Sequence, residues 1–240
     1  MNALEWESCA DPDKLLNALS HGEDKRKVWF GSDPSLSRKG RLLVLASCDR
    51  VCPKRASAPL GELFTLAFRY LETPPPLHAK GWLKRFRGFT FNRRSTAVYL
   101  ALTTPVGNGL RLLRECVHED SSVPKRRRRQ TKPMTSAQEG VAQAHLIRDI
   151  YANPWAPLEV DELERGRWLR WNNACIRHMA AAMYQSGDFQ NMPILADALE
   201  EAGCEHEEIL EHCRGYINGL PRKQQHVKGC WVVDMLLGQS

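Results

Sequence analysis

The stretch NMPILADALEEAGCEHEEILEHCRG, residues 191–215, decides the fold class of this chain. Pro193 suits the first turn of a helix, apolar residues then recur at three- and four-residue steps, and Gly203 ends the helix. A second helix follows, with acidic residues such as Glu207 near its start and Arg214 at its end, the polarity that the helix macrodipole favours. Helices joined by so short a turn lie antiparallel. The stretch therefore predicts a helical hairpin.

Similar helix punctuation surrounds this hairpin on both sides. The predicted neighbours are a helix opened by a capping box at Ser136 and Glu139 and ending near Tyr151, a rigid turn at 153–157, a helix from about Arg167 to Gly187, and a last apolar segment at 230–238. Short connections again favour antiparallel packing. We therefore predict a mainly α protein with a compact α-helical C-terminal domain at 136–240.

The N-terminal region, residues 1–117, is predicted to be helical but is less clearly punctuated. Predicted helices start at Asp11-Pro12 and cover 41–51, 58–72 and 110–116. For 41–51 the apolar run alone does not separate a helix from a strand, and helix is favoured because helical spacing follows downstream. The fold of residues 73–110 is left open between a hairpin and a helix.

Charge divides the chain into two halves of opposite sign. Residues 1–135 hold 25 Lys and Arg against 13 Asp and Glu, whereas residues 136–240 hold 9 against 15. The net charge of +6 therefore conceals a basic half and an acidic half. A basic half of this kind favours an anionic partner, and the acidic half of the same chain is one candidate.

The strongest indication of a binding surface is a basic stretch interleaved with aromatic residues. Its members are Lys80, Trp82, Lys84, Arg85, Phe86, Arg87, Arg93 and Arg94. Cations of this kind neutralise phosphates, and exposed aromatic rings stack on unpaired bases. The alternative is that the aromatics belong to a core and the cations to a solvated face. The stretch thus predicts a surface for a protein partner or a nucleic acid. The alternative of a core with a solvated cationic face stays open.

A second basic cluster lies in the segment 118–135, which joins the two halves. The run consists of Lys125, Arg126, Arg127, Arg128 and Arg129. The segment is polar, charged and proline-containing, so it cannot bury a core and is predicted to be a cationic linker. Such runs contact phosphates, contact acidic proteins or remain solvated, and solvation is the interpretation we favour.

Eight cysteines raise the question of metal binding. The candidate ligand set is Cys204, Cys213, His226 and Cys230, in which the last two residues have the spacing of a zinc finger. The first two lack the tight knuckle spacing and flank a short helix. The alternative interpretation, which we favour, is that the thiols are buried and behave as small hydrophobes. Zinc is therefore a hypothesis, and no other cofactor is predicted.

Several segments of the chain resemble a known family. Asn153-Pro154-Trp155, MPILADALEEAGC (192–204), EHCRG (211–215) and HVKGCWVVDMLLG (226–238) resemble the carboxyl end of a family of uncharacterised proteins that is abundant in Planctomycetes. The opening EWESCADPDKLL (5–16) resembles the start of the same family. The chain departs from the family pattern by an insertion, YINGLPRKQQ, at 216–225. The resemblance implies a bacterial protein and no particular activity, cofactor or catalytic residue.

Motifs of catalysis find no support in the sequence. It contains no Walker loop, no G-x-S-x-G elbow and no H-E-x-x-H. The amino terminus carries acidic residues where a signal peptide needs positive charge, and no apolar run is long enough for a membrane span. We therefore predict a cytoplasmic, non-enzymatic accessory or adaptor protein with a protein or nucleic-acid partner, no membrane contact and no small-molecule substrate. The alternatives are a direct nucleic-acid binder and a small zinc-stabilised helical module.

Overall fold

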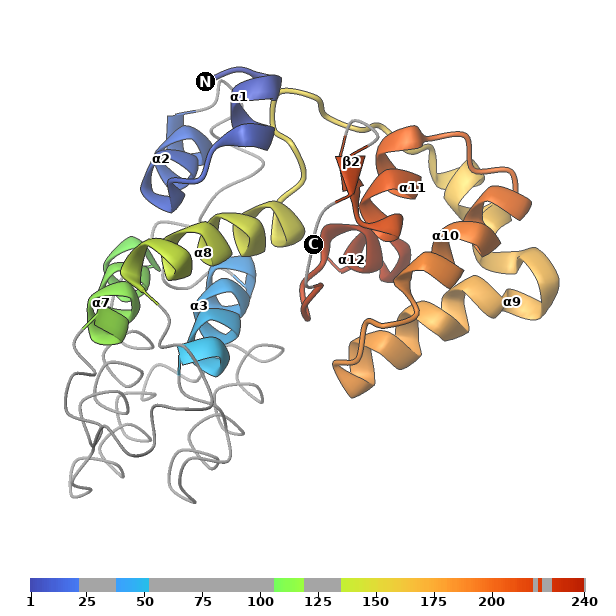
Figure 1. Ribbon diagram of the computed structural model, residues 1–240. Coiled ribbons are helices and arrows are strands. Elements are labelled where there is room, and N and C mark those ends of the chain that lie inside the picture. The colour runs from blue at the N-terminus through green and yellow to red at the C-terminus, as the bar shows by residue number, and fades with distance from the viewer. Residues whose placement is uncertain (22–37, 52–105, 119–134, 218–219, 222–225, 240) are drawn as a thin grey trace, which may run out of the picture. The chain divides into compact units, whose positions relative to one another are not determined.

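The computed structural model describes residues 1–21, 38–51, 106–118, 135–217, 220–221 and 226–239 (Figure 1). The chain forms two compact units. One combines Met1–Cys9 with His145–Ser240, and the other is Ala10–Ala144. We call them the C-terminal unit and the N-terminal unit. Helices dominate the described residues of both units, which confirms the prediction of a mainly α fold.

The described part of the N-terminal unit consists of helices. They are α2 (Pro12–His21), α3 (Arg38–Val51), α7 (Val106–His118) and the first part of α8 (Ser136–Ile150). Asp11 caps α2, since its Oδ1 accepts a hydrogen bond from the Asp13 amide at 3.0 Å. In α3 the residues Leu42 to Leu45 are all buried, and the helix packs against α7. The helix predicted for 41–51 is therefore present.

The capping box of α8 lies one residue earlier than predicted. Thr135 Oγ1 accepts from the Gln138 amide at 3.2 Å, and Gln138 Oε1 accepts from the Thr135 amide at 2.9 Å. Glu139, expected in that role, is buried instead and lies 3.4 Å from Arg50 Nε. Burial raises the pKa of the Glu139 carboxyl, and the Arg50 charge opposes that rise. Thr135 and Gln138 thus cap the first turn of α8, whereas the Glu139 side chain is buried in the core.

The C-terminal unit is a set of short helices around one hydrophobic core. Its elements are α1 (Ala3–Ser8), the end of α8, α9 (Glu162–Ser186), α10 (Met192–Glu201), α11 (Glu207–Arg214), β1 (Tyr216–Ile217), β2 (Leu220–Pro221) and α12 (Trp231–Leu237). In Figure 1, α10 lies between α9 and α11, and it packs against both. Helix α12 packs against α9 and α11. The helices predicted at 191–203 and 207–214 are present, and the apolar segment at 230–238 contains helix α12.

Glycines end these helices where the sequence predicts an end. Gly187 and Gly215 have φ angles of 71° and 74°, in the left-handed region that an L side chain adopts only with strain. A two-residue antiparallel ladder, in which Tyr216 pairs with Pro221, then follows α11 inside the inserted segment. The ladder was not predicted, although the Asn218-Gly219 dipeptide between its strands is typical of tight hairpins.

Helix α9 is interrupted by three residues in left-handed conformation. Asn172, Asn173 and Ala174 have φ angles of 44°, 56° and 60°, so α9 consists of two helices joined by a turn. Asparagine tolerates this conformation because its short side chain bonds locally, whereas alanine does not. The sequence prediction of one helix to Gly187 missed this break.

Ala174→Gly is expected to stabilise the protein by about 1 kcal/mol, because glycine removes the clash of Cβ at positive φ. Ala182→Gly is the matched control, since Ala182 is exposed in the second helical part of α9 and has ordinary helical geometry. That change is expected to destabilise by about 1 kcal/mol. Urea unfolding of both variants measures the two effects, and equal signs would contradict the left-handed turn.

Several sequence predictions concern residues outside those described. These are the helix at 58–72, the open segment 73–105, both basic clusters (80–94 and 125–129) and the linker between 119 and 134. Among the residues that the structure does describe, no helix combines the length and apolarity needed to cross a membrane.

Candidate metal centre

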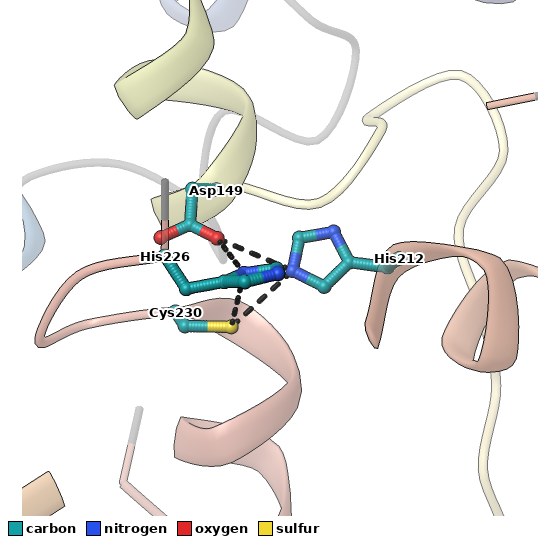
Figure 2. A group of neighbouring side chains, drawn as sticks. All are labelled: Asp149, His212, His226 and Cys230. Carbon is teal, nitrogen blue, oxygen red and sulfur yellow. Dashed lines mark hydrogen bonds and ion pairs between the residues drawn. The ribbon is translucent and has the colours of Figure 1, made fainter. Parts of the chain in front are cut away.

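Four side chains of the C-terminal unit converge on one point (Figure 2). Asp149 comes from the last turn of α8, His212 from α11, His226 from the segment before α12, and Cys230 from the N-cap of α12. One potential ligand atom from each lies within 4.8 Å of those of the other three. Their side chains are at least nine-tenths buried. We call these four residues the cluster.

Local backbone geometry brings His226 and Cys230 to the same place. The Cys230 amide donates to the Val227 carbonyl at 2.9 Å, which closes a tight turn. Gly229 within this turn has a φ of 101°, a conformation that favours glycine. The turn therefore directs the imidazole before it and the thiol after it toward one point.

The donor atoms are separated by distances that suit a shared central atom. His226 Nδ1 lies 2.7 Å from Asp149 Oδ1, and His212 Nε2 lies 3.3 Å from the same oxygen. Cys230 Sγ lies 3.2 Å from His212 Nε2 and 3.8 Å from His226 Nδ1. The dashed lines of Figure 2 follow these four contacts. All four donors thus face inward.

Asp149 is a fully buried carboxylate whose charge the cluster stabilises. Burial by itself raises its pKa, but the hydrogen bonds and charges of His212 and His226 outweigh burial and hold the pKa well below the usual value. Its second oxygen, Oδ2, accepts from the Val227 amide at 2.8 Å. That bond orients the carboxylate so that Oδ1 points to the centre.

Cys230 is a neutral thiol unless a nearby positive charge compensates the negative charge of its thiolate. Burial raises the pKa of Cys230, and the nearby Asp149 carboxylate raises it further. A thiolate at this position therefore requires an additional positive charge. A metal ion at the centre of the cluster supplies such a charge, since coordination deprotonates a thiol.

The arrangement differs from that of a nucleophilic triad. In a triad the nucleophile and the carboxylate bind opposite nitrogens of one imidazole, so that the ring relays a proton. Here Asp149 and Cys230 both approach Nε2 of His212, and both approach Nδ1 of His226. The geometry is that of ligands around a centre and does not provide a relay.

Trp231 contacts His212 from outside the cluster. Its indole Nε1 donates to His212 Nδ1 at 3.1 Å, and the two rings lie 5.0 Å apart. Because an indole N–H only donates, His212 Nδ1 accepts, and the proton of a neutral ring is on Nε2, facing Asp149. A metal bound at Nε2 would place the proton on Nδ1 and so break the indole contact.

The cluster shares two residues with the metal set predicted from the sequence. His226 and Cys230 belong to both, whereas Cys204 and Cys213 lie in the hydrophobic core outside the cluster. Burial raises the pKa of both of these thiols, which suits the alternative interpretation as buried hydrophobes. His206, near Cys204 in sequence, contacts Glu164 at 3.3 Å instead.

Neither Asp149 nor His212 belongs to the metal set predicted from the sequence. Asp149 lies in an ordinary amphipathic helix, and His212 lies in the last turn of α11, where a cation is favourable. One sequence observation could have identified Asp149, which is an acidic residue on the apolar side of its helix between Arg148 and Ile150. No local pattern connects it to a histidine 77 residues further along the chain.

No protein-family model, no curated protein and no solved structure matches the chain.

Proposed function

We propose that the C-terminal unit is a zinc-stabilised helical module in which Asp149, His212, His226 and Cys230 hold one structural Zn²⁺. The observation that supports this proposal is the convergence of four buried donor atoms from four separate segments. Cysteine, histidine and aspartate are the ligands that zinc takes in proteins. The zinc hypothesis and two of the ligands, His226 and Cys230, come from the sequence. The other two ligands, Asp149 and His212, are identified only by the fold.

The separations between donor atoms fit a tetrahedral ion. Ligands at about 2.0–2.3 Å from zinc lie roughly 3.3–3.6 Å from one another in a tetrahedron. The His212–Asp149, His212–Cys230 and His226–Cys230 distances of 3.3, 3.2 and 3.8 Å surround this range. The 2.7 Å between His226 and Asp149 is a hydrogen-bond distance, and zinc would replace this bond by two ligand bonds.

The charges of the cluster also balance around a divalent ion. A carboxylate from Asp149 and a thiolate from Cys230 contribute two negative charges, and neutral imidazoles contribute none. Zn²⁺ bound to this set forms a neutral unit, which a buried site accommodates at lower cost than a net charge. This balance favours a divalent ion over a monovalent one.

The site favours a structural role over a catalytic one. Catalytic zinc keeps a position open for water or substrate, whereas structural zinc has four protein ligands. Here four protein donors are present and all are buried, so the coordination shell is complete. The ion would connect the end of α8 to α11 and α12 within the C-terminal unit.

The accessory or adaptor function remains a prediction from the basic-aromatic stretch, as does direct nucleic-acid binding. Both depend on residues 80–94 and 125–129, outside the described part of the chain. A zinc-stabilised module is compatible with either function.

Metal content distinguishes the cluster from the set predicted by sequence. The protein, loaded with zinc and freed of excess, is expected to contain one equivalent by elemental analysis. Cys230→Ser is expected to lower the affinity for zinc. The loss should exceed the roughly 10–100-fold that follows mutation of a residue that only supports a ligand. Cys204→Ser is the matched control, because Cys204 is also buried but lies outside the cluster. Equal zinc loss in both variants would contradict the assignment.

The Trp231 indole provides a second readout of the same experiment. Zinc at His212 Nε2 moves the ring proton to Nδ1, where the indole N–H no longer has an acceptor. The indole resonance of Trp231, identified by its absence in Trp231→Phe, is therefore expected to shift on zinc addition. An unchanged resonance with one equivalent of zinc bound would show that His212 is not a ligand.

A further inference from the structure

A cavity of about 250 Å³ opens in the C-terminal unit beside the cluster. Helix α1 forms one wall, the turn that follows α8 forms a second, and α11 with Trp231 forms a third. Its volume is below the ~300–1,000 Å³ typical of sites for drug-sized molecules and cofactors. The cavity therefore suits a single side chain better than a nucleotide or cofactor.

Hydrogen bonds hold the walls of this cavity in place. Arg148 Nη1 donates to the Trp6 carbonyl at 3.1 Å and to the Cys9 carbonyl at 2.7 Å, which ties α1 to the end of α8. Asn153 Nδ2 donates to the Ala3 carbonyl at 3.4 Å and to Glu7 Oε1 at 3.3 Å. The α1 wall is thus fixed by contacts to groups at the end of α8 and in the turn after it, so the cavity is preformed.

The cavity lining combines acidic groups with one accessible indole ring. Glu7, Glu208 and Glu211 line it together with one guanidinium, that of Arg148, so carboxylates outnumber cations by three to one. Arg148 is itself buried and bonded to main-chain carbonyls. The half-buried Trp231 supplies aromatic surface at which a cation is attracted to the ring face, Trp6 is fully buried behind the wall, and His212 also lines the cavity. Charge and aromaticity both favour a positively charged occupant.

An arginine side chain matches this lining better than a lysine side chain. Its planar guanidinium binds carboxylates through two parallel hydrogen bonds and stacks on indole rings, whereas an ammonium is a compact, strongly hydrated charge. Leu4 lies in the lining and is 72% exposed, so the cavity also presents apolar surface for the neighbours of such an arginine. An extended peptide segment has both components.

We propose that this cavity is the binding site for an arginine side chain of a partner protein. The proposal goes beyond the zinc module. The cavity shares His212 and Trp231 with the zinc site, but the proposal requires no bound zinc, and the test uses the protein as purified. It also gives the acidic C-terminal half a recognition role of its own, separate from that of the basic clusters.

The probe is N-acetyl-arginine N-methylamide, and its binding is followed by the indole resonance of Trp231. Millimolar probe is expected to shift this resonance in a saturable manner. The citrulline analogue is nearly isosteric but neutral, and it is expected to bind at least about tenfold more weakly because it lacks the charge. Equal binding of the two amides, or no shift with either, would overturn the proposal.

Variants of two adjacent glutamates provide the matched comparison. Glu208 lines the cavity, whereas its neighbour Glu207 does not, although both are exposed residues in the first turn of α11. Glu208→Gln is expected to lower the affinity for the arginine amide about fivefold, and Glu207→Gln is expected to lower it by less than about twofold. Equal weakening would indicate general attraction to an acidic surface and would overturn the site. Binding of the amide only after Arg126–Arg129 are replaced by serine would assign the cavity to this chain's own linker.

Discussion

Removal of zinc by a chelator is expected to lower the free energy of unfolding of the protein by about 4 kcal/mol, for free zinc initially 1,000-fold above its dissociation constant. The reason is that zinc binds the folded cluster, whose four donors come from segments that are far apart in the unfolded chain. Urea unfolding, followed by circular dichroism with and without chelator, measures this difference.

The variants separate a zinc effect from a general effect of chelator. Cys230→Ser is expected to have nearly the same stability in both conditions, because it has already lost most of its zinc affinity. Cys204→Ser is expected to keep the full chelator response, since Cys204 is buried in the core away from the cluster. A wild-type protein whose unfolding does not respond to chelator would contradict a structural zinc site.

Asp149→Ala is expected to destabilise the protein by roughly 3–5 kcal/mol at neutral pH, even with chelator present. The Asp149 carboxylate accepts from His226, from the Val227 amide and from His212, and all three donors would be left inside the protein without this acceptor. Asp197→Ala is the control, because Asp197 is exposed and pairs only at the surface with Arg214. The control is expected to cost less than about 1 kcal/mol.

Acid is expected to reduce the difference between wild type and Asp149→Ala. The folded state lowers the pKa of Asp149, so this group stabilises the protein above its unfolded pKa of about 3.9. That contribution is lost as pH falls through the folded pKa. Unfolding measured in chelator from pH 4 down to pH 2 tests the sign in the range where Asp149 itself titrates, and a difference that grows over that range would contradict a stabilising Asp149 charge.

The helices of the C-terminal unit were predictable because their determinants are local. Pro193 at the start of α10, Gly187 and Gly215 after helix ends, and the acidic start of α11 all lie within a turn of the boundary they specify. Two local predictions still missed. Thr135 replaces Ser136 as the cap of α8, and Asn172 to Ala174 break α9. The cap depends on which of two neighbouring hydroxyl residues the packing selects, and no glycine or proline in the sequence marks the break at 172–174.

The metal centre was predictable only in part. His226 and Cys230 are four residues apart, so their pairing is a matter of local spacing. Cys204 and Cys213 complete the set predicted from the sequence only because they are cysteines near this pair along the chain. The fold instead buries both thiols in the core and places His212 and Asp149 beside the pair.

The sequence by itself determined the mainly α class, most helix boundaries in the C-terminal unit and one pair of candidate ligands. These depend on periodicity and end residues, which act over a few positions along the chain. Only the tertiary structure decided that Asp149 joins His226 across 77 residues and that α1 closes one wall of the cavity. Such contacts depend on how helices pack, and packing depends on the volumes and polar groups of the whole core, which no local pattern records.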